Sequence, residues 1–208
     1  MSPASGPSPS DVARAFFDAL RDGRWADAAA LVHPDATVAL RESCLAHLVA
    51  WAEHRDESRA APERDGMVVG YSSDGIVDST RLARQAGTPL PAFDGRPTLG
   101  ALAELEPAAF MATLLSASNP AVCATMAGPF ARPSRRVIGD VSEGEALAHV
   151  LYRAENVGVA YTDPHHVDVV HLSCVDQDWR VTLTAMNYDL IDGGYMLRMY
   201  GADEPEGG

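Results

Sequence analysis

The chain has 208 residues, of which 47% are hydrophobic and 22% are charged. These proportions are typical of a globular protein with one sizeable core, and they exclude a disordered or fibrous chain. All 16 basic residues are arginine, which excludes a Schiff-base lysine and the lysine of a P-loop. The formal charge of −13 repels nucleic acid and anionic membranes. It favours a neutral or cationic small molecule as partner, although the same charge also serves plain solubility.

The cysteine spacing and the polarity of the first residues bear on the cellular compartment of the protein. Cys44, Cys123 and Cys174 are widely separated and form no CxxC, which favours reduced thiols over a disulfide framework. Residues 1–9 are too polar for a signal peptide, and no apolar run approaches the ~18 residues of a membrane span. We therefore expect a cytoplasmic protein. No GxGxxG or Walker sequence occurs, so no nucleotide cofactor is expected.

Two helices are predicted near the start of the chain. Residues 1–9 are expected to be disordered, because Ser, Pro, Gly and Ala bury too little surface to become ordered. The first helix should begin at the N-cap Ser10 and end at Gly23. The second is a short helix that Pro34 ends after His33.

A strand and a longer helix are predicted next. Residues 36–43 alternate in side-chain character and indicate a short strand. A helix over residues 42–59 follows and carries two stripes at helical spacing. The first stripe should face the core and consists of Leu45, Leu48, Val49 and Ala52. The second consists of His47, Trp51 and His54. This second stripe either lines a pocket wall or packs under a loop.

The pattern weakens over residues 60–107, where turns surround a short helix near residues 79–87. Another amphipathic helix is predicted over residues 105–118. The last third is rich in strands, with two strands on either side of residues 142–144, a third over 165–175 and a fourth over 179–190. Short connections between successive strands predict an antiparallel sheet. Residues 201–208 form an acidic tail without a folding signal.

Four segments carry a resemblance to a known superfamily. They are DVARAFFDALRDGRWADAAALVHPDATV at the start and EALAHVLYR, HVDVVHLSCV and DQDWRVTL near the end. Their order, a helical pair before long antiparallel strands, resembles the nuclear-transport-factor-2-like, or ketosteroid-isomerase-like, superfamily over about half the chain. The resemblance reports fold and not chemistry, because many activities share these features.

The resemblance implies an α+β fold in which N-terminal helices pack in a strongly curved antiparallel sheet, a cone with an apolar pocket. A single domain would cover residues 10–200, with an insertion at about 60–107. Members include isomerases, dehydratases, polyketide cyclases and epoxide hydrolases, alongside proteins that only bind or associate. In the ketosteroid-isomerase-like enzymes a carboxylate in the cone moves a proton. The predicted strand over residues 36–43 is the first place where such a carboxylate would be expected, and it contains no Asp.

The histidine-rich strand is the first candidate for chemistry. His166 and Asp168 fall on one face of the predicted third strand, while His165 and His171 fall on the other. A carboxylate beside an imidazole in an apolar cone makes a general acid–base pair. Alternatively, these polar residues are solvated at the rim of the sheet.

His149 is the third candidate catalytic residue. It shares a face with Leu147 and Leu151, so it lies among apolar neighbours if that face is the inner one. It is then either an acid–base group of the pocket or a core histidine bonded to a backbone carbonyl.

Four further residues are candidates for substrate binding. Tyr152 and Asn187 would donate hydrogen bonds to a substrate oxygen, and Trp51 and His47 would line the pocket. Each has an ordinary structural alternative as a sheet or core residue. No HExxH or zinc-finger spacing occurs, so no metal site is predicted. A site built from His166, Asp168 and His149 is nonetheless geometrically allowed.

Two functions follow as hypotheses. The first is an isomerase, dehydratase or cyclase without an organic cofactor that acts on a small hydrophobic molecule. In it His166 and His149 exchange protons, Asp168 orients His166, and Tyr152 or Asn187 polarises a carbonyl. The second is a non-catalytic binding or association module. It would form a homodimer through the open sheet face, with residues 150–157 and 181–188 presenting Val, Leu and Thr outward.

Overall fold

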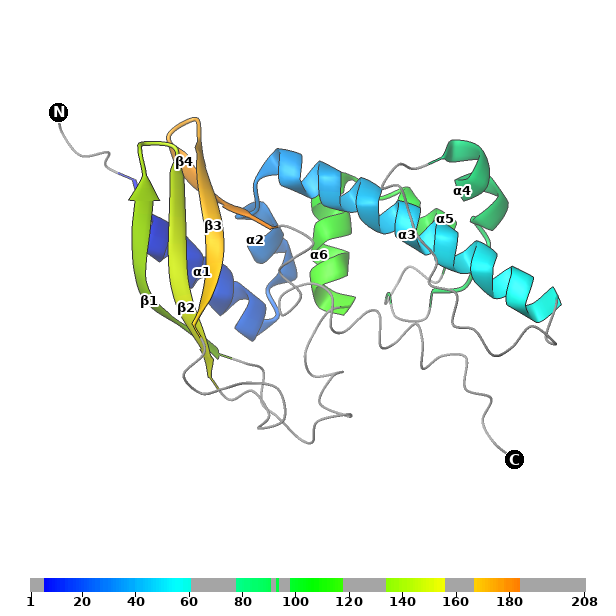
Figure 1. Cartoon of the computed structure of the whole chain (residues 1–208), viewed down its shortest axis with the longest axis horizontal. Helices are drawn as coiled ribbons and strands as arrows, with labels where there is room; N and C mark the ends of the chain where they lie inside the picture. Colours follow the sequence, from blue (N-terminus) through cyan, green and yellow to red (C-terminus); the bar gives the residue numbers. More distant parts are fainter. Residues whose placement is uncertain are drawn as a thin grey trace.

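The computed structural model describes residues 6–60, 78–90, 93, 98–117, 134–155 and 167–183. A four-stranded sheet packs on α1, α2 packs against α1 and α6, and the long helix α3 leads away from the sheet towards α4 and α5 (Figure 1). The helices are α1 (Pro9–Asp22), α2 (Trp25–Ala30), α3 (Pro34–Ala60), α4 (Ser79–Gln85), α5 (Leu99–Ala103) and α6 (Pro107–Ala117). The strands are β1 (Ser134–Glu143), β2 (Leu147–Glu155), β3 (Asp168–Val175) and β4 (Asp178–Thr182).

Helix α1 begins earlier than the sequence pattern predicts. Ser8, not Ser10, is the N-cap, and its side chain accepts a hydrogen bond from the backbone N–H of Asp11 at 3.2 Å. The Asp11 carboxylate accepts one in return from the Ser8 backbone, which completes a capping box, and Pro9 occupies the first turn. Gly23 ends the helix as predicted, with a φ of 70° that favours glycine.

The predicted strand over residues 36–43 is wrong, because these residues lie within the first three turns of α3, which begins at Pro34. Pro34 begins this helix where a missing N–H costs nothing. Thr37 is buried, and its hydroxyl donates to the carbonyl of His33 at 3.0 Å, one helical turn back. The alternation in this segment is too short to distinguish a period of two from a helical period.

The sheet is antiparallel, with the strand order β1-β2-β3-β4. The predicted DQD connection is a tight hairpin turn in which Asp176 and Gln177 have positive φ values of 51° and 73°. The outer edge of β4 is covered by a single parallel bridge between Val181 and Val32. The α+β class and the antiparallel sheet are thus confirmed, and the strong curvature that would make the sheet a cone stays a prediction.

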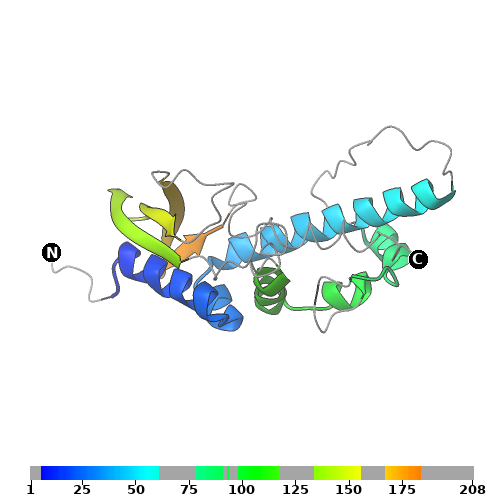
Figure 2. The same ribbon diagram turned by 90° about the horizontal axis from the view of Figure 1, so that it is seen from below.

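Helix α1 lies across one face of the sheet, which we call the inner face (Figure 2). The rings of Phe17 on α1 and Tyr152 on β2 have centroids 4.7 Å apart. Six side chains of β2, β3 and β4 are fully buried on this face: Ala148, Val150, Tyr152, Val170, Leu172 and Val181. The hydrophobic effect of this burial holds the sheet on the helix.

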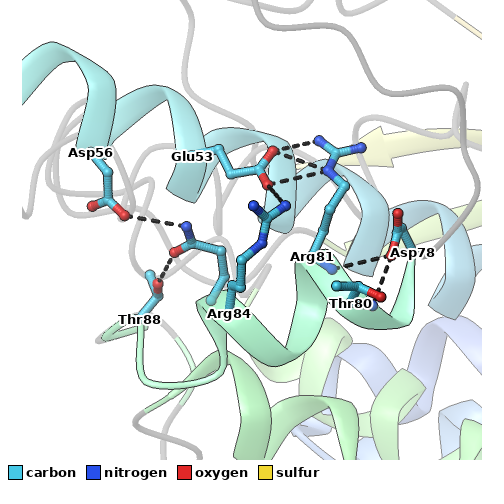
Figure 3. A network of polar contacts seen from close by, with 8 residues as sticks. Glu53, Asp56, Asp78, Thr80, Arg81, Arg84 and Thr88 are labelled. Carbon is cyan, nitrogen blue, oxygen red and sulfur yellow. Dashed lines mark hydrogen bonds and ion pairs between the residues drawn. The ribbon is translucent and has the colours of Figure 1, made fainter.

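Polar contacts join α4 to the far half of α3 (Figure 3). Arg81 donates to both carboxylate oxygens of Glu53, through Nε at 3.2 and 3.1 Å and through Nη2. This hydrogen-bonded guanidinium holds the pKa of Glu53 below its usual range. Both side chains are partly exposed, so the pair adds only about 0–1 kcal/mol to stability. We attribute most of the stability here to buried apolar side chains of the 78–103 region, namely Leu90, Phe93, Leu99 and Leu102.

Candidate functional site

The strand register assigns each candidate side chain to one face of the sheet. Residues directly opposite each other in an antiparallel pair lie on the same face. Tyr152 stands opposite Asp168, which places Asp168 on the inner face. His149 stands opposite His171. His149 lies between the buried residues Ala148 and Val150 along β2, so both histidines are on the outer face.

Asp168 begins β3 at the end of the inner face. Its neighbour Tyr152 is fully buried against Phe17, so Tyr152 is a core residue in the described structure. The Asp168 side chain is half-buried and accepts a hydrogen bond from the backbone N–H of Val169 at 3.2 Å. His166 and Asn187 lie outside the described residues, so the predicted His166–Asp168 pair stays a prediction.

His149 lies away from Asp168. The face that it shares with Leu147 and Leu151 is the outer one, and Leu147 is 46% exposed. The sheet therefore separates His149 from Asp168, and the two side chains do not meet in one site. The alternation of side chains along a strand is the reason, because residues at odd and even positions leave the sheet on opposite sides.

A histidine pair on the outer face is the site that the sequence did not reveal. The Nδ1 atoms of His149 and His171 are 2.8 Å apart, and the two rings meet edge to face with centroids at 5.0 Å. The Nε2 atom of His149 lies 3.3 Å from Oε1 of Glu143. This Nε2 is shielded from solvent and makes no well-oriented hydrogen bond, so the contact with Glu143 is an electrostatic one. Only the register of β2 on β3 brings the two histidines together.

Trp51 and His47 lie on α3, which packs against α4, α5 and α6. Trp51 is buried in the hydrophobic core and His47 is half-buried. Burial lowers the pKa of His47 from the ordinary 6.5, because a charged imidazole loses solvation there. In the described structure Trp51 thus contributes to the core.

The lowered pKa of His47 predicts that acid weakens the fold. The unfolded chain binds a proton more readily than the folded one, so this contribution to stability is complete above 6.5 and is lost as the pH falls towards the lowered folded pKa. Replacing His47 by Gln should therefore reduce the loss of stability between about pH 7.5 and about pH 5.5. Urea denaturation of both proteins at the two pH values measures this. An equal loss in both would contradict the prediction.

Across residues 6–60, 78–90, 98–117, 134–155 and 167–183, no group of three or more His, Cys, Asp or Glu side chains is placed to hold a metal ion. In the same part of the chain, no helix has the length and apolar character needed to cross a bilayer. No family model matches the chain, and neither the curated proteins nor the solved structures contain a match.

Proposed function

We propose that this protein is a non-catalytic association module that pairs with a second copy of itself through the outer face of its sheet. One observation carries the proposal. Three of the four large apolar side chains that are exposed in the described part of the chain belong to β1 and β2, namely Ile138, Val141 and Leu147. The register places Val141 and Leu147 on the outer face, and Ile138 lies at the β-bulge of β1. Exposed apolar groups on one sheet face mark an interaction surface.

The packing of the inner face supports a role without catalysis. Helix α1 covers that face and its Phe17 ring contacts Tyr152, while Val150 and Val170 are fully buried in the same core. The residues that face outward are not all those that the sequence analysis predicted for residues 150–157 and 181–188. Val150 and Val181 point into the core. Only the alternate residues, such as Leu151 and Thr182, belong to the outer face.

The charges at the two ends of the outer face favour a second copy as the partner. Arg136 and Arg153 stand opposite each other at one end, and Glu143 lies at the other end. Arg136 and Glu143 are seven residues apart along β1, which corresponds to ~23 Å at ~3.3 Å per residue. A twofold axis that runs across the strands, between two facing sheets, would place each arginine end over the partner's glutamate end.

A single charge in the apolar centre tests this pairing. Val141 is 56% exposed, so Val141→Glu should leave the fold intact. A carboxylate buried between two sheets costs ~2 kcal/mol or more, so the dimer dissociation constant should rise by at least about 30-fold. Sedimentation velocity over a concentration series measures it. The matched control is Val38→Glu, which puts the same charge on an α3 side chain that is 42% exposed and should leave the dimer unchanged.

Two outcomes would contradict the proposal: a wild-type protein that stays monomeric, or two variants that weaken association equally. The double variant Arg136→Glu with Glu143→Arg tests whether the arginine end of one sheet faces the glutamate end of the other. Each single swap should weaken the dimer, and the double swap should restore part of the loss, because the complementary charges are exchanged together.

The proposal extends to fold and location. The order of a helical pair, further helices and an antiparallel sheet packed on α1 supports a nuclear-transport-factor-2-like cone. The three widely spaced cysteines support a cytoplasmic location. A small hydrophobic ligand and acid–base chemistry stay predictions that depend on His166 and Asn187.

A further inference from the structure

We propose that His149 and His171 chelate one divalent transition-metal ion through their Nδ1 atoms. The site lies on the outer face of the sheet, within one chain, and it does not require the association proposed above. Divalent copper and nickel fit it best among the first-row ions. Imidazole nitrogen suits both, and both accept ligands at right angles.

The distance between the two nitrogens carries the argument. Two ligands bonded to one ion at ~2.05 Å and about 90° to each other are ~2.9 Å apart. The Nδ1 atoms of His149 and His171 are 2.8 Å apart. A tetrahedral arrangement would need ~3.3 Å, which explains why a square-planar or octahedral ion fits better than zinc.

The backbone holds the pair in this geometry. His149 and His171 stand directly opposite each other on β2 and β3, in the middle of a sheet whose inner face is packed against α1. Opposite residues of antiparallel strands have Cβ atoms only about 4.5–5.5 Å apart. Ligands on strands keep their positions better than ligands on loops. In the unassociated chain, water molecules would complete the coordination, because His171 is exposed there.

Glu143 is the carboxylate that lies near the second ring nitrogen of His149. A ligating imidazole normally donates its other N–H to a carboxylate, which fixes the tautomer and makes the bound nitrogen more basic. The second nitrogen of His149 lies 3.3 Å from the Glu143 carboxylate. The Glu143 side chain is 65% exposed and has room to turn towards a better angle. This arrangement assigns the His149 proton to Nε2 and leaves Nδ1 as the metal ligand.

The protons balance without an additional reactant. The direction of the hydrogen bond between the two Nδ1 atoms depends on the tautomers. With the His149 proton on Nε2, Nδ1 of His171 is the donor and Nδ1 of His149 the acceptor. When an ion binds, both Nδ1 lone pairs are taken. The His171 proton moves to Nε2 of the same ring by way of solvent. Binding thus changes the tautomer of one histidine and leaves the net number of protons unchanged.

The test is a titration of the full-length, untagged protein with nickel(II) chloride, and separately with copper(II) chloride, in a buffer that does not bind metals. Isothermal titration calorimetry should show one ion per chain. His149→Gln and His171→Gln should each abolish this binding. Glu143→Gln should weaken it by about 10-fold, which is the usual effect of losing an outer carboxylate. The matched control is His47→Gln, which removes a histidine of α3, away from the sheet, and should bind like the wild type.

Circular dichroism and the oligomeric state of each variant are recorded alongside, which separates this proposal from the association proposal. A wild-type protein that binds no ion, or a folded His149→Gln protein that binds as tightly as the wild type, would overturn the chelate. Loss of binding in His47→Gln alone would also overturn it. An unchanged affinity in Glu143→Gln would overturn the part assigned to the carboxylate.

Discussion

Replacing Tyr152 by Ala is expected to lower the free energy of unfolding by about 3–5 kcal/mol. The Tyr152 side chain is fully buried on the inner face, and its ring meets the Phe17 ring at a centroid distance of 4.7 Å and an angle of 53°. The substitution removes the transfer energy of a large ring and leaves a cavity that the sheet and α1 close only in part.

Urea denaturation followed by circular dichroism measures the loss. Tyr152→Phe keeps the ring and should cost much less than Tyr152→Ala. Leu147→Ala truncates a side chain of the same strand that is 46% exposed, so it should cost less than about 1 kcal/mol. A loss below about 1 kcal/mol for Tyr152→Ala would mean that the inner face is not packed as described. In that case the predicted role of Tyr152 in substrate binding would regain support.

Some elements were predictable because a few residues determine them locally. Gly23 ends α1 in the sequence analysis and in the structure, because its positive φ favours glycine. The turn at Asp176 and Gln177 joins two runs of strand-forming residues, which indicates a hairpin without any tertiary information. The strands on either side of that turn were therefore predictable as a pair.

The first part of α3 was not predictable in this way. Over residues 36–43 both a period of two and a helical period can be found, and the β-branched Thr37 favours a strand. Its burial and its hydrogen bond to His33 decide in favour of a helix. The hydrogen bond is local, but the burial is a tertiary effect, and the bridge between Val32 and Val181 holds the chain just before α3.

The candidate site depended on the same kind of information. Along β2 both faces carry apolar residues, with Leu147 and Leu151 on one and Val150 on the other. The alternation shows that two faces exist, and only the packing of α1 shows which is the inner one. The pairing of His149 with His171 requires the register of β2 on β3, which the long connection at residues 156–167 leaves open in the sequence.

Replacing Phe110 by Ala is expected to cost a similar amount, about 3–5 kcal/mol, at a place where the effect reaches both ends of the molecule. Phe110 is fully buried on α6, next to the buried Met111, Leu114 and Leu115. Helix α6 packs against α2, which belongs to the sheet end, and against α3, which leads to α4 and α5 (Figure 1). The cavity would therefore loosen the connection between the two ends.

The transition should stay a single one, because α6 contacts both ends and couples their unfolding. Tryptophan fluorescence and circular dichroism should report the same midpoint in wild type and variant, since tryptophans lie on α2, α3 and β4. Thr113→Ala is the matched control on the same helix. The hydroxyl of Thr113 donates only to the carbonyl of Ala109, at 2.9 Å, so its loss should change stability by less than about 0.5 kcal/mol. Two separate transitions, of which Phe110→Ala shifts only one, would instead show that the sheet end and the α3–α5 end unfold independently and that α6 belongs to one of them alone.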